Sequence, residues 1–223
     1  FHQALTNVGC KCVFACDIDK NCRDTYYKNY GLKPKKDITE INIDNIPSFD
    51  ILCAGFPCQS FSKAGNQKGF ADENRGNLFF NICDIVKKHK PKYMIMENVR
   101  NLSSHDNGNT WNTIKKNIIK LGYYTYDEPL ILNVLHFGIP QHRERVVILC
   151  KRKDLGKLPE KPIIKKINKN KLTCSVKDII IDDENTAKYK ITGKLKVTEK
   201  IWNKFIKILK DNDIEMPKFP IWT

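Results

Sequence analysis

Two kinds of hydrophobic pattern alternate along the first 150 residues of this 223-residue chain. Short apolar runs with the length of buried strands occupy Phe49–Ala54, Tyr93–Met96 and Val146–Cys150. Between them, Asn77–Lys90 and Thr110–Leu121 carry apolar residues at helical spacing. An alternation of strands and helices predicts an α/β fold with a parallel sheet.

The N-terminal part predicts two further helices and one strand. We expect a short helix over Phe1–Val8 and a strand over Lys11–Cys16. A second helix should span Asp19–Tyr30 and stop at Gly31, because glycine tolerates the left-handed conformation that ends many helices. After the helix at 110–121, two short runs over 123–126 and 130–135 predict a hairpin.

The character of the sequence changes after Lys151. Lys157–Lys171 is rich in lysine and proline, which is typical of a linker, and Val197–Leu209 has helical spacing. We therefore predict a catalytic domain over residues 1–152, followed over residues 153–223 by a linker and the beginning of a second domain.

The charge balance favours a polyanionic partner. The chain holds 39 lysines and arginines against 25 acidic residues, a net charge of +14, which favours nucleic acid or anionic surfaces. Only six of the basic residues are arginine, and such a lysine excess is also what genome composition alone produces. Charge therefore supports DNA binding without establishing it.

Cysteine usage indicates a reducing compartment. Nine cysteines occur without a secretory segment, so we expect free thiols and a cytoplasmic, nucleoid-associated protein. Four cysteines cluster at positions 10, 12, 16 and 22, but they form no C-x-x-C pair, and core packing is a better interpretation than zinc. No apolar run approaches the roughly 20 residues of a membrane span, and no membrane association is expected.

The most informative stretch is Gly55-Phe56-Pro57-Cys58-Gln59-Ser60-Phe61-Ser62. Gly55 and Pro57 should end the preceding strand and place Cys58 just beyond its carboxyl end, where open α/β sheets bind ligands. A thiol acts as a nucleophile only as thiolate, which requires such a polar, open setting. The alternative for a single cysteine is a small buried hydrophobe.

Two further segments belong with Cys58. Glu97-Asn98-Val99 should sit at the carboxyl end of the next strand, so that a carboxyl group and a thiol share one crevice; the alternative is a turn cap. Arg143 and Arg145, two residues apart on an extended segment, should point to one face and suit planar contacts to phosphate or base edges. The alternative is a surface salt bridge to Glu144.

Two acidic residues could meet a nucleotide. Asp17 ends the predicted strand at 11–16, where a carboxylate accepts hydrogen bonds from ribose hydroxyls, while Asp19 is better placed as a helix cap. Asp37 either accepts from an adenine amino group or begins a turn. The loop Phe61–Arg75 is of a length that is usually either functional or mobile.

Together these motifs resemble the DNA (cytosine-5)-methyltransferases of bacterial restriction-modification systems. Pro57-Cys58-Gln59, Glu97-Asn98-Val99 and Gln141-x-Arg143-x-Arg145 follow one another in the family's order and approximate spacing. The linking segments at 67–70, 75–79 and 104–110 are also similar, and the resemblance covers roughly residues 1–152.

The resemblance implies a doubly wound, mostly parallel sheet of the Rossmann-like methyltransferase type and S-adenosylmethionine as cofactor. It implies catalytic roles for Cys58 as nucleophile, for Glu97 at cytosine N3 and the amino group, and for Arg145 and Arg143 at the base oxygen and phosphate. The implied cofactor-pocket positions are Asp17, Ile18, Asp37, Ile38, Pro57 and Leu78. The expected DNA contacts are Gln59, Ser62, Lys63, Lys68, Arg75 and Gln141.

The sequence departs from the family pattern in three places. Ile18 stands where an aromatic residue often stacks on adenine. The glycine-rich first motif and the last two motifs are absent, and Phe1 is no initiator Met, so we expect the middle of a longer enzyme. We expect that parent enzyme to be active and these 223 residues alone to be inactive.

Double-stranded DNA is the expected substrate, a cognate restriction endonuclease acting on the same site is a further expected partner, and the protein is expected to be a monomer. Two alternatives stay open, a tRNA cytosine-5 methyltransferase and a catalytically dead DNA-binding fragment. A zinc-dependent deaminase is disfavoured, because the chain has neither H-x-E nor P-C-x-x-C.

Overall fold

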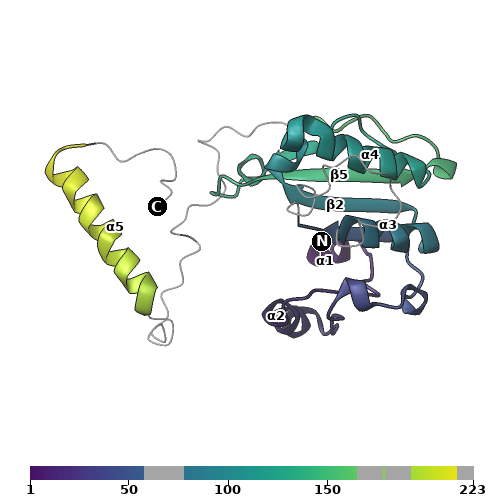
Figure 1. Cartoon of the computed structure of the whole chain (residues 1–223), viewed down its shortest axis with the longest axis horizontal. Helices are drawn as coiled ribbons and strands as arrows, with labels where there is room; N and C mark the ends of the chain where they lie inside the picture. The colour runs from purple at the N-terminus through teal and green to yellow at the C-terminus, as the bar shows by residue number, and fades with distance from the viewer. Residues whose placement is uncertain (58–77, 165–177, 179–191, 215–223) are drawn as a thin grey trace. The chain divides into compact units, whose positions relative to one another are not determined.

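The computed structural model describes residues 1–57, 78–164, 178 and 192–214 (Figure 1). It divides into two compact units, Phe1–Ser175 and Val176–Thr223. The first unit contains the sheet and all the predicted catalytic and cofactor segments, and the second contains one long helix.

The first unit is built on a five-stranded sheet with the order β1-β2-β5-β3, in which β4 also pairs with β5. The strands are β1 (Ile51–Gly55), β2 (Tyr93–Val99), β3 (Tyr123–Thr125), β4 (Leu130–Asn133) and β5 (Glu144–Arg152). β1 and β2 are parallel, whereas β5 is antiparallel to β2, β3 and β4. The parallel pair is joined by a crossover helix, whereas the connection from β4 to β5 is too short for a crossover, and these two consecutive strands are antiparallel.

Five α-helices accompany the strands in the described parts of the chain. They are α1 (His2–Thr6), α2 (Lys20–Tyr30), α3 (Leu78–His89), α4 (Asn109–Lys120) and α5 (Gly193–Asp211). α2 begins where the Asp19 side chain accepts a hydrogen bond from the Cys22 amide, and it ends at Gly31 with φ of 67°. The predicted cap and stop of this helix are therefore confirmed. None of the described helices is both long and apolar enough to cross a membrane.

One face of the β2–β5 pair is buried at the centre of the sheet. Met94 lies opposite Cys150, and Met96 lies opposite Ile148 in the β2–β5 register, and all four side chains are buried. α3 and α4 supply the other half of this core with Phe79, Ile82, Ile85, Val86, Trp111, Ile114 and Ile118. On the opposite face of β2, Ile95 and Glu97 are only half-buried, so polar chemistry is possible there.

The predicted α/β class is confirmed, but two of its predicted parts are wrong. The two strands expected to form a hairpin, β3 and β4, do not pair with each other; each pairs with β5 instead. The expected strand at 11–16 is reduced to one isolated parallel bridge between Cys16 and Lys35. Only two backbone hydrogen bonds, Lys35 N to Ala15 O and Asp17 N to Lys35 O, hold that bridge.

Two strand ends also differ from expectation. Gly55 continues β1 instead of ending it, because it pairs with Glu97 across the parallel ladder. Glu97, Asn98 and Val99 are the last three residues of β2 instead of a turn beyond it, because β5 extends far enough to pair with each of them. The carboxyl group therefore projects from a paired strand, which fixes its direction.

Candidate active site

Glu97 lies at the centre of the candidate site, between one residue of β1 and one of β5. In the β1–β2 ladder Glu97 pairs with Gly55, and in the β2–β5 ladder it pairs with Val147. Arg145 is two residues from Val147, so it shares the Glu97 face of the sheet as a diagonal neighbour. Three strands thus bring a glycine, a carboxylate and a guanidinium into one row.

A salt bridge joins the two charged members of this row. Arg145 Nε lies 2.8 Å from Glu97 Oε1, and the two side chains are 24% and 35% exposed. Arg145 also donates from its NH1 nitrogen to the backbone carbonyl of Glu144 at 2.8 Å. Arg145 is therefore held at both ends of its guanidinium and presents a fixed direction.

The second oxygen of Glu97 faces β1. A Cβ atom added at Gly55 would lie 3.5 Å from Glu97 Oε2. Gly55 has no side chain, so no Cβ atom stands at this position next to Oε2, on the strand that continues into Phe56 and Pro57. Pro57 is the last described residue before the gap at 58–77, and Cys58 follows it in the sequence.

Asn98 ties the end of β2 to that segment. Its side chain is 3% exposed, and its Nδ2 donates a hydrogen bond of 2.7 Å to the Phe56 carbonyl oxygen. Its Oδ1 accepts from the Val99 amide at 2.9 Å. A buried amide with both ends hydrogen-bonded holds Phe56 at a fixed distance from Glu97. We assigned no role to Asn98 from the sequence, although its place on the opposite face directly after Glu97 was a signal for it.

The predicted arginine pair is resolved into two different environments. Arg145 pairs with Glu97, whereas Arg143 is exposed and its amide N–H donates to Asn133 Oδ1 at 3.3 Å. The alternative, a salt bridge from Arg143 or Arg145 to the Glu144 carboxylate, is not found among the described residues, where that carboxylate pairs with Arg100 at 2.9 Å. Gln141 is exposed beside Arg143.

A second group of predicted residues lies around the Cys16–Lys35 bridge. This bridge places Asp17 and Asp37 close together, and both carboxylates act on one thiol: the pKa of Cys16 is raised first by burial and then by Asp37 and Asp17. The Asp17 side chain accepts from the Asp19 amide at 2.8 Å. Ile18, between Asp17 and Asp19 in the sequence, is 68% exposed.

Asp37 begins a short turn and also keeps a negative charge. Its Oδ1 accepts from the Thr39 amide at 2.9 Å and from the Thr39 hydroxyl at 2.8 Å. These hydrogen bonds hold the pKa of Asp37 below its ordinary range. Ile38 follows it and packs against the core. The turn that was the alternative for Asp37 is therefore present, and it leaves an ionised carboxylate beside Asp17.

The remaining predicted residues border or fall within the part of the chain that the structure leaves undescribed. Pro57 and Leu78 are the described residues on its two sides. Outside the described residues lie the predicted nucleophile and most of the predicted DNA contacts, Cys58, Gln59, Ser62, Lys63, Lys68 and Arg75.

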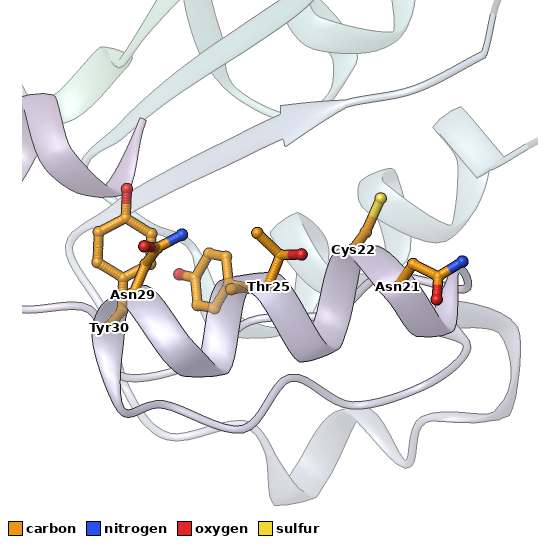
Figure 2. A pocket seen from close by; sticks show the side chains of 6 residues that line it. Asn21, Cys22, Thr25, Asn29 and Tyr30 are labelled. Carbon is orange, nitrogen blue, oxygen red and sulfur yellow. The ribbon is translucent and has the colours of Figure 1, made fainter. Parts of the chain in front are cut away.

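A pocket of about 420 Å³ lies elsewhere, along α2 (Figure 2). Its lining side chains come from one side of that helix, Asn21, Cys22, Thr25, Tyr26, Asn29 and Tyr30. His2 of α1 stacks on Tyr30 with ring centroids 4.0 Å apart. None of the residues predicted to be functional lines this pocket, so it is not the candidate active site.

The fold is similar to solved methyltransferase structures. The DNMT2 structure of Spodoptera frugiperda superposes with a TM-score of 0.58 and 21% identity, over 82% of this chain and 56% of that one. The Dnmt2 methyltransferase of S. pombe gives a TM-score of 0.51 and 24% identity, over 68% and 46% of the two chains. At these identities the similarity concerns the fold.

The sequence comparisons are more specific. The model of the C-5 cytosine-specific DNA methylases matches residues 1–222. The Type II methyltransferase M.HhaI of Haemophilus parahaemolyticus is 49% identical over 156 residues, which are 70% of this chain and 47% of that protein. M1.ScrFI of Lactococcus lactis subsp. cremoris is 39% identical over 196 residues, 87% of this chain and 48% of that protein. The chain spans about half the length of these curated relatives.

Proposed function

Because this chain belongs to the C-5 cytosine-specific DNA methylase family, we propose that the protein transfers a methyl group from S-adenosylmethionine to C5 of cytosine in double-stranded DNA. The observation that carries this proposal is the row of Gly55, Glu97 and Arg145 across three strands. Gly55, the β1 member of this row, stands two residues before the Pro57-Cys58-Gln59 motif in the sequence. The match to the DNA methylase model and to Type II methyltransferases does not favour the tRNA enzyme or the inactive fragment.

The first task of such a site is to make C5 of cytosine nucleophilic. We assign this to Cys58, whose thiolate adds to C6 of the ring and forms a carbon–sulfur bond. The electron pair displaced from the C5–C6 double bond makes C5 an enamine carbon, provided that N3 gains a proton. This division of the reaction into two easier steps is the purpose of covalent catalysis.

Glu97 is assigned to N3 and the amino group of the cytosine. Its Oε1 is engaged by Arg145 Nε at 2.8 Å, while its Oε2 lies on the Gly55 side, where no side chain stands next to it. Oε2 is therefore the atom that meets the base, and it supplies or shares the proton that N3 requires. After transfer, the C5 proton passes to a base such as water and the N3 proton returns to Glu97, so that the C5–C6 double bond forms again and the Cys58 thiolate leaves.

Arg145 is assigned to orient both the Glu97 carboxylate and the cytosine base. Its Nε anchors the carboxylate, and its planar guanidinium has further N–H donors for the base oxygen. Arg143, exposed on the same segment, is assigned to polar and phosphate contacts near the site. Asn98 supports the arrangement from the buried side, because it fixes Phe56 two residues before the nucleophile.

The cofactor is assigned to the neighbouring group of carboxylates. Asp17 suits ribose hydroxyls, the exposed Ile18 offers an apolar surface for adenine, and Asp37, kept ionised by Thr39, accepts from the adenine amino group. Ile38, Pro57 and Leu78 complete the assignment. These residues fit the donor and acceptor pattern of an adenosine, and S-adenosylmethionine, when bound, supplies an electrophilic methyl group.

DNA is the proposed partner, with the catalytic domain in residues 1–152 and target recognition beginning in residues 153–223. The cytosine must leave the duplex to reach Cys58, which costs a few kcal/mol. The proposed DNA contacts are Gln59, Ser62, Lys63, Lys68, Arg75 and Gln141, with Ser62, Lys63 and Lys68 at phosphates. A cognate endonuclease, a monomeric state and association with the nucleoid belong to the same proposal.

The proposal is tested on the complete protein that carries this chain. It is incubated with labelled S-adenosylmethionine and an equimolar mixture of duplex DNA and tRNA, and 5-methylcytosine is then measured in each. We expect label in DNA that depends on Cys58 and Glu97. Label confined to tRNA would move the substrate class to RNA, and no label in either would leave a non-catalytic protein.

A further inference from the structure

From Lys196 to its C-terminal end, the helix α5 of the second unit separates basic from apolar residues, whereas Lys194 at its start lies on the apolar half. At 100° per residue, five lysines fall within about 120° of its circumference. These lysines, called here the lysine stripe, are Lys196, Lys200, Lys204, Lys207 and Lys210, and all five are exposed. The other half of the helix carries Leu195, Val197, Ile201, Trp202, Phe205, Ile206, Ile208 and Leu209.

The stripe carries an excess of positive charge. Within α5 only Glu199 and Asp211 are acidic, at the edge and at the C-terminal end of the stripe. Among the residues that the structure describes, no ion pair joins a lysine of the stripe to a carboxylate. The ordinary explanation, lysines that neutralise nearby acids on a solvated face, therefore accounts for little of this pattern.

The geometry of the stripe suits a phosphate backbone. From Lys196 to Lys210 the helix rises about 21 Å, a length over which duplex DNA presents roughly a dozen phosphate charges. Lysine is a flexible point charge and does not read base edges as arginine does. The stripe therefore suits contacts that hold DNA in place without selecting its sequence.

A membrane surface fits the same helix less well. Insertion into lipid needs the aromatic residues of the apolar half, but Trp202 and Phe205 are half-buried and packed edge to face, with ring centroids 5.7 Å apart. Leu209 is 8% exposed. Leu195, Val197, Ile201 and Ile208 are exposed, so the apolar half is only partly covered.

We propose that the lysine stripe of α5 binds the phosphate backbone of duplex DNA and holds it to the protein during methyl transfer. This inference rests on the proposed function, because it takes DNA as the substrate. Each lysine that neutralises a phosphate should add about 0.9 to the slope of log affinity against log salt concentration. The stripe therefore contributes to the salt dependence of binding and leaves the target sequence unchanged.

The test uses the complete protein with Lys200, Lys204 and Lys207 changed to glutamine. DNA affinity is measured by fluorescence anisotropy from about 50 to 200 mM salt, where the slope should become shallower by about 2.7. The charge-conserving change of the same three lysines to arginine should keep the original slope. Lys194→Gln, on the apolar half, should change it little, as should glutamine at the exposed Lys28, Lys33 and Lys120 of the first unit.

The outcomes separate this inference from the proposed function. An unchanged slope in the glutamine variant, with normal helix content by circular dichroism and normal methylation at low salt, would overturn the lysine stripe and leave the function intact. An equal change in the Lys28, Lys33 and Lys120 variant would overturn it too, because net charge alone would explain both. Stripe-dependent sedimentation with phosphatidylserine vesicles and an unchanged DNA slope would replace DNA by a lipid surface.

Discussion

Replacing Asn98 by alanine removes the buried link between β2 and the segment that leads to Cys58. The side chain is 3% exposed, and the change deletes the 2.7 Å hydrogen bond to the Phe56 carbonyl and the 2.9 Å bond from the Val99 amide. Loss of a buried hydrogen-bond partner costs about 1–3 kcal/mol. In a chain of this size, each kcal/mol lowers the melting temperature by about 2–4 °C, so we expect a decrease of roughly 2–12 °C.

The effect on methyl transfer should exceed the effect on stability. Phe56 lies two residues before Cys58, and a displacement of about 1 Å at a reacting group costs on the order of a hundredfold in rate. We therefore expect Asn98→Ala to lower kcat at least tenfold at a temperature where the variant is fully folded. The measurement is steady-state kcat and the single-turnover rate for methylation of duplex DNA by the complete protein, with circular dichroism to verify folding.

Tyr123→Phe provides a matched control. Tyr123 is 1% exposed, and its hydroxyl donates a 2.6 Å hydrogen bond to the Pro91 carbonyl, so this change also removes a buried donor from a backbone carbonyl. Tyr123 and Pro91 have no proposed role in the reaction. The control should lose stability and keep kcat. If Asn98→Ala loses stability with an unchanged kcat, or if both variants lose kcat equally, the positioning argument is refuted.

Three further predictions concern charge and backbone conformation. Glu97→Gln keeps the shape of the side chain but removes the carboxyl group that can exchange a proton with N3, so kcat should fall about 10²- to 10⁴-fold, measured against Arg145→Lys, which keeps the positive charge and should lose less. Lys90→Gly should raise the free energy of unfolding by up to about 1 kcal/mol in a denaturant titration, because Lys90 has φ of 46° after α3; a loss of stability would contradict this. The pKa of Asp127 lies below its ordinary value of 3.8 because Lys115 donates a hydrogen bond to it. Stability from this pair is present above 3.8 and is lost as the pH falls through the lower folded value, so the melting temperature should fall less steeply between about pH 4 and 2 in Asp127→Asn; equal slopes would contradict it.

Elements whose pattern comes from burial on one side were predicted well from the sequence. The apolar stripe at 77–90 corresponds to α3, and its Phe79, Ile82, Ile85 and Val86 are buried. The sequence also identified the N-cap and C-cap residues of the helix at 19–30, Asp19 and Gly31. Local chemistry and periodicity were sufficient for these elements.

Strand pairing could not be predicted in the same way, because it depends on contacts between distant segments. β3 and β4 had the pattern of a hairpin, but each pairs with β5 instead. β5 has nine residues and is long enough to pair with both. The same long β5 extended β2 through Val99. The segment at 11–16 has the composition of a strand, yet it makes only one bridge among the described residues.

The charged residues of the candidate site were named from the sequence, but the contacts that hold them in place were not. Glu97 and Arg145 were both expected to serve the same base, and the structure joins them in a 2.8 Å salt bridge; their roles in the reaction stay predictions. The pairing of Glu144 with Arg100 was not expected, because Arg143 and Arg145 are nearer in sequence. The contact between Asn98 and Phe56 joins residues 42 positions apart, which no local pattern reveals. The roles of Cys58 and of the DNA contacts beside it stay predictions.

The central claim is that Cys58 attacks C6 of a cytosine in DNA while Glu97 and Arg145 hold the ring. The most direct measurement incubates the complete protein with S-adenosylmethionine and duplex DNA containing 5-fluorocytosine. Fluorine at C5 cannot leave as the proton does, so the reaction should stop with the protein covalently bound to DNA. We predict a denaturation-resistant adduct that disappears in Cys58→Ser and is strongly reduced in Glu97→Gln. An adduct that persists in Cys58→Ser, or the absence of any adduct with the unchanged protein, would contradict the account.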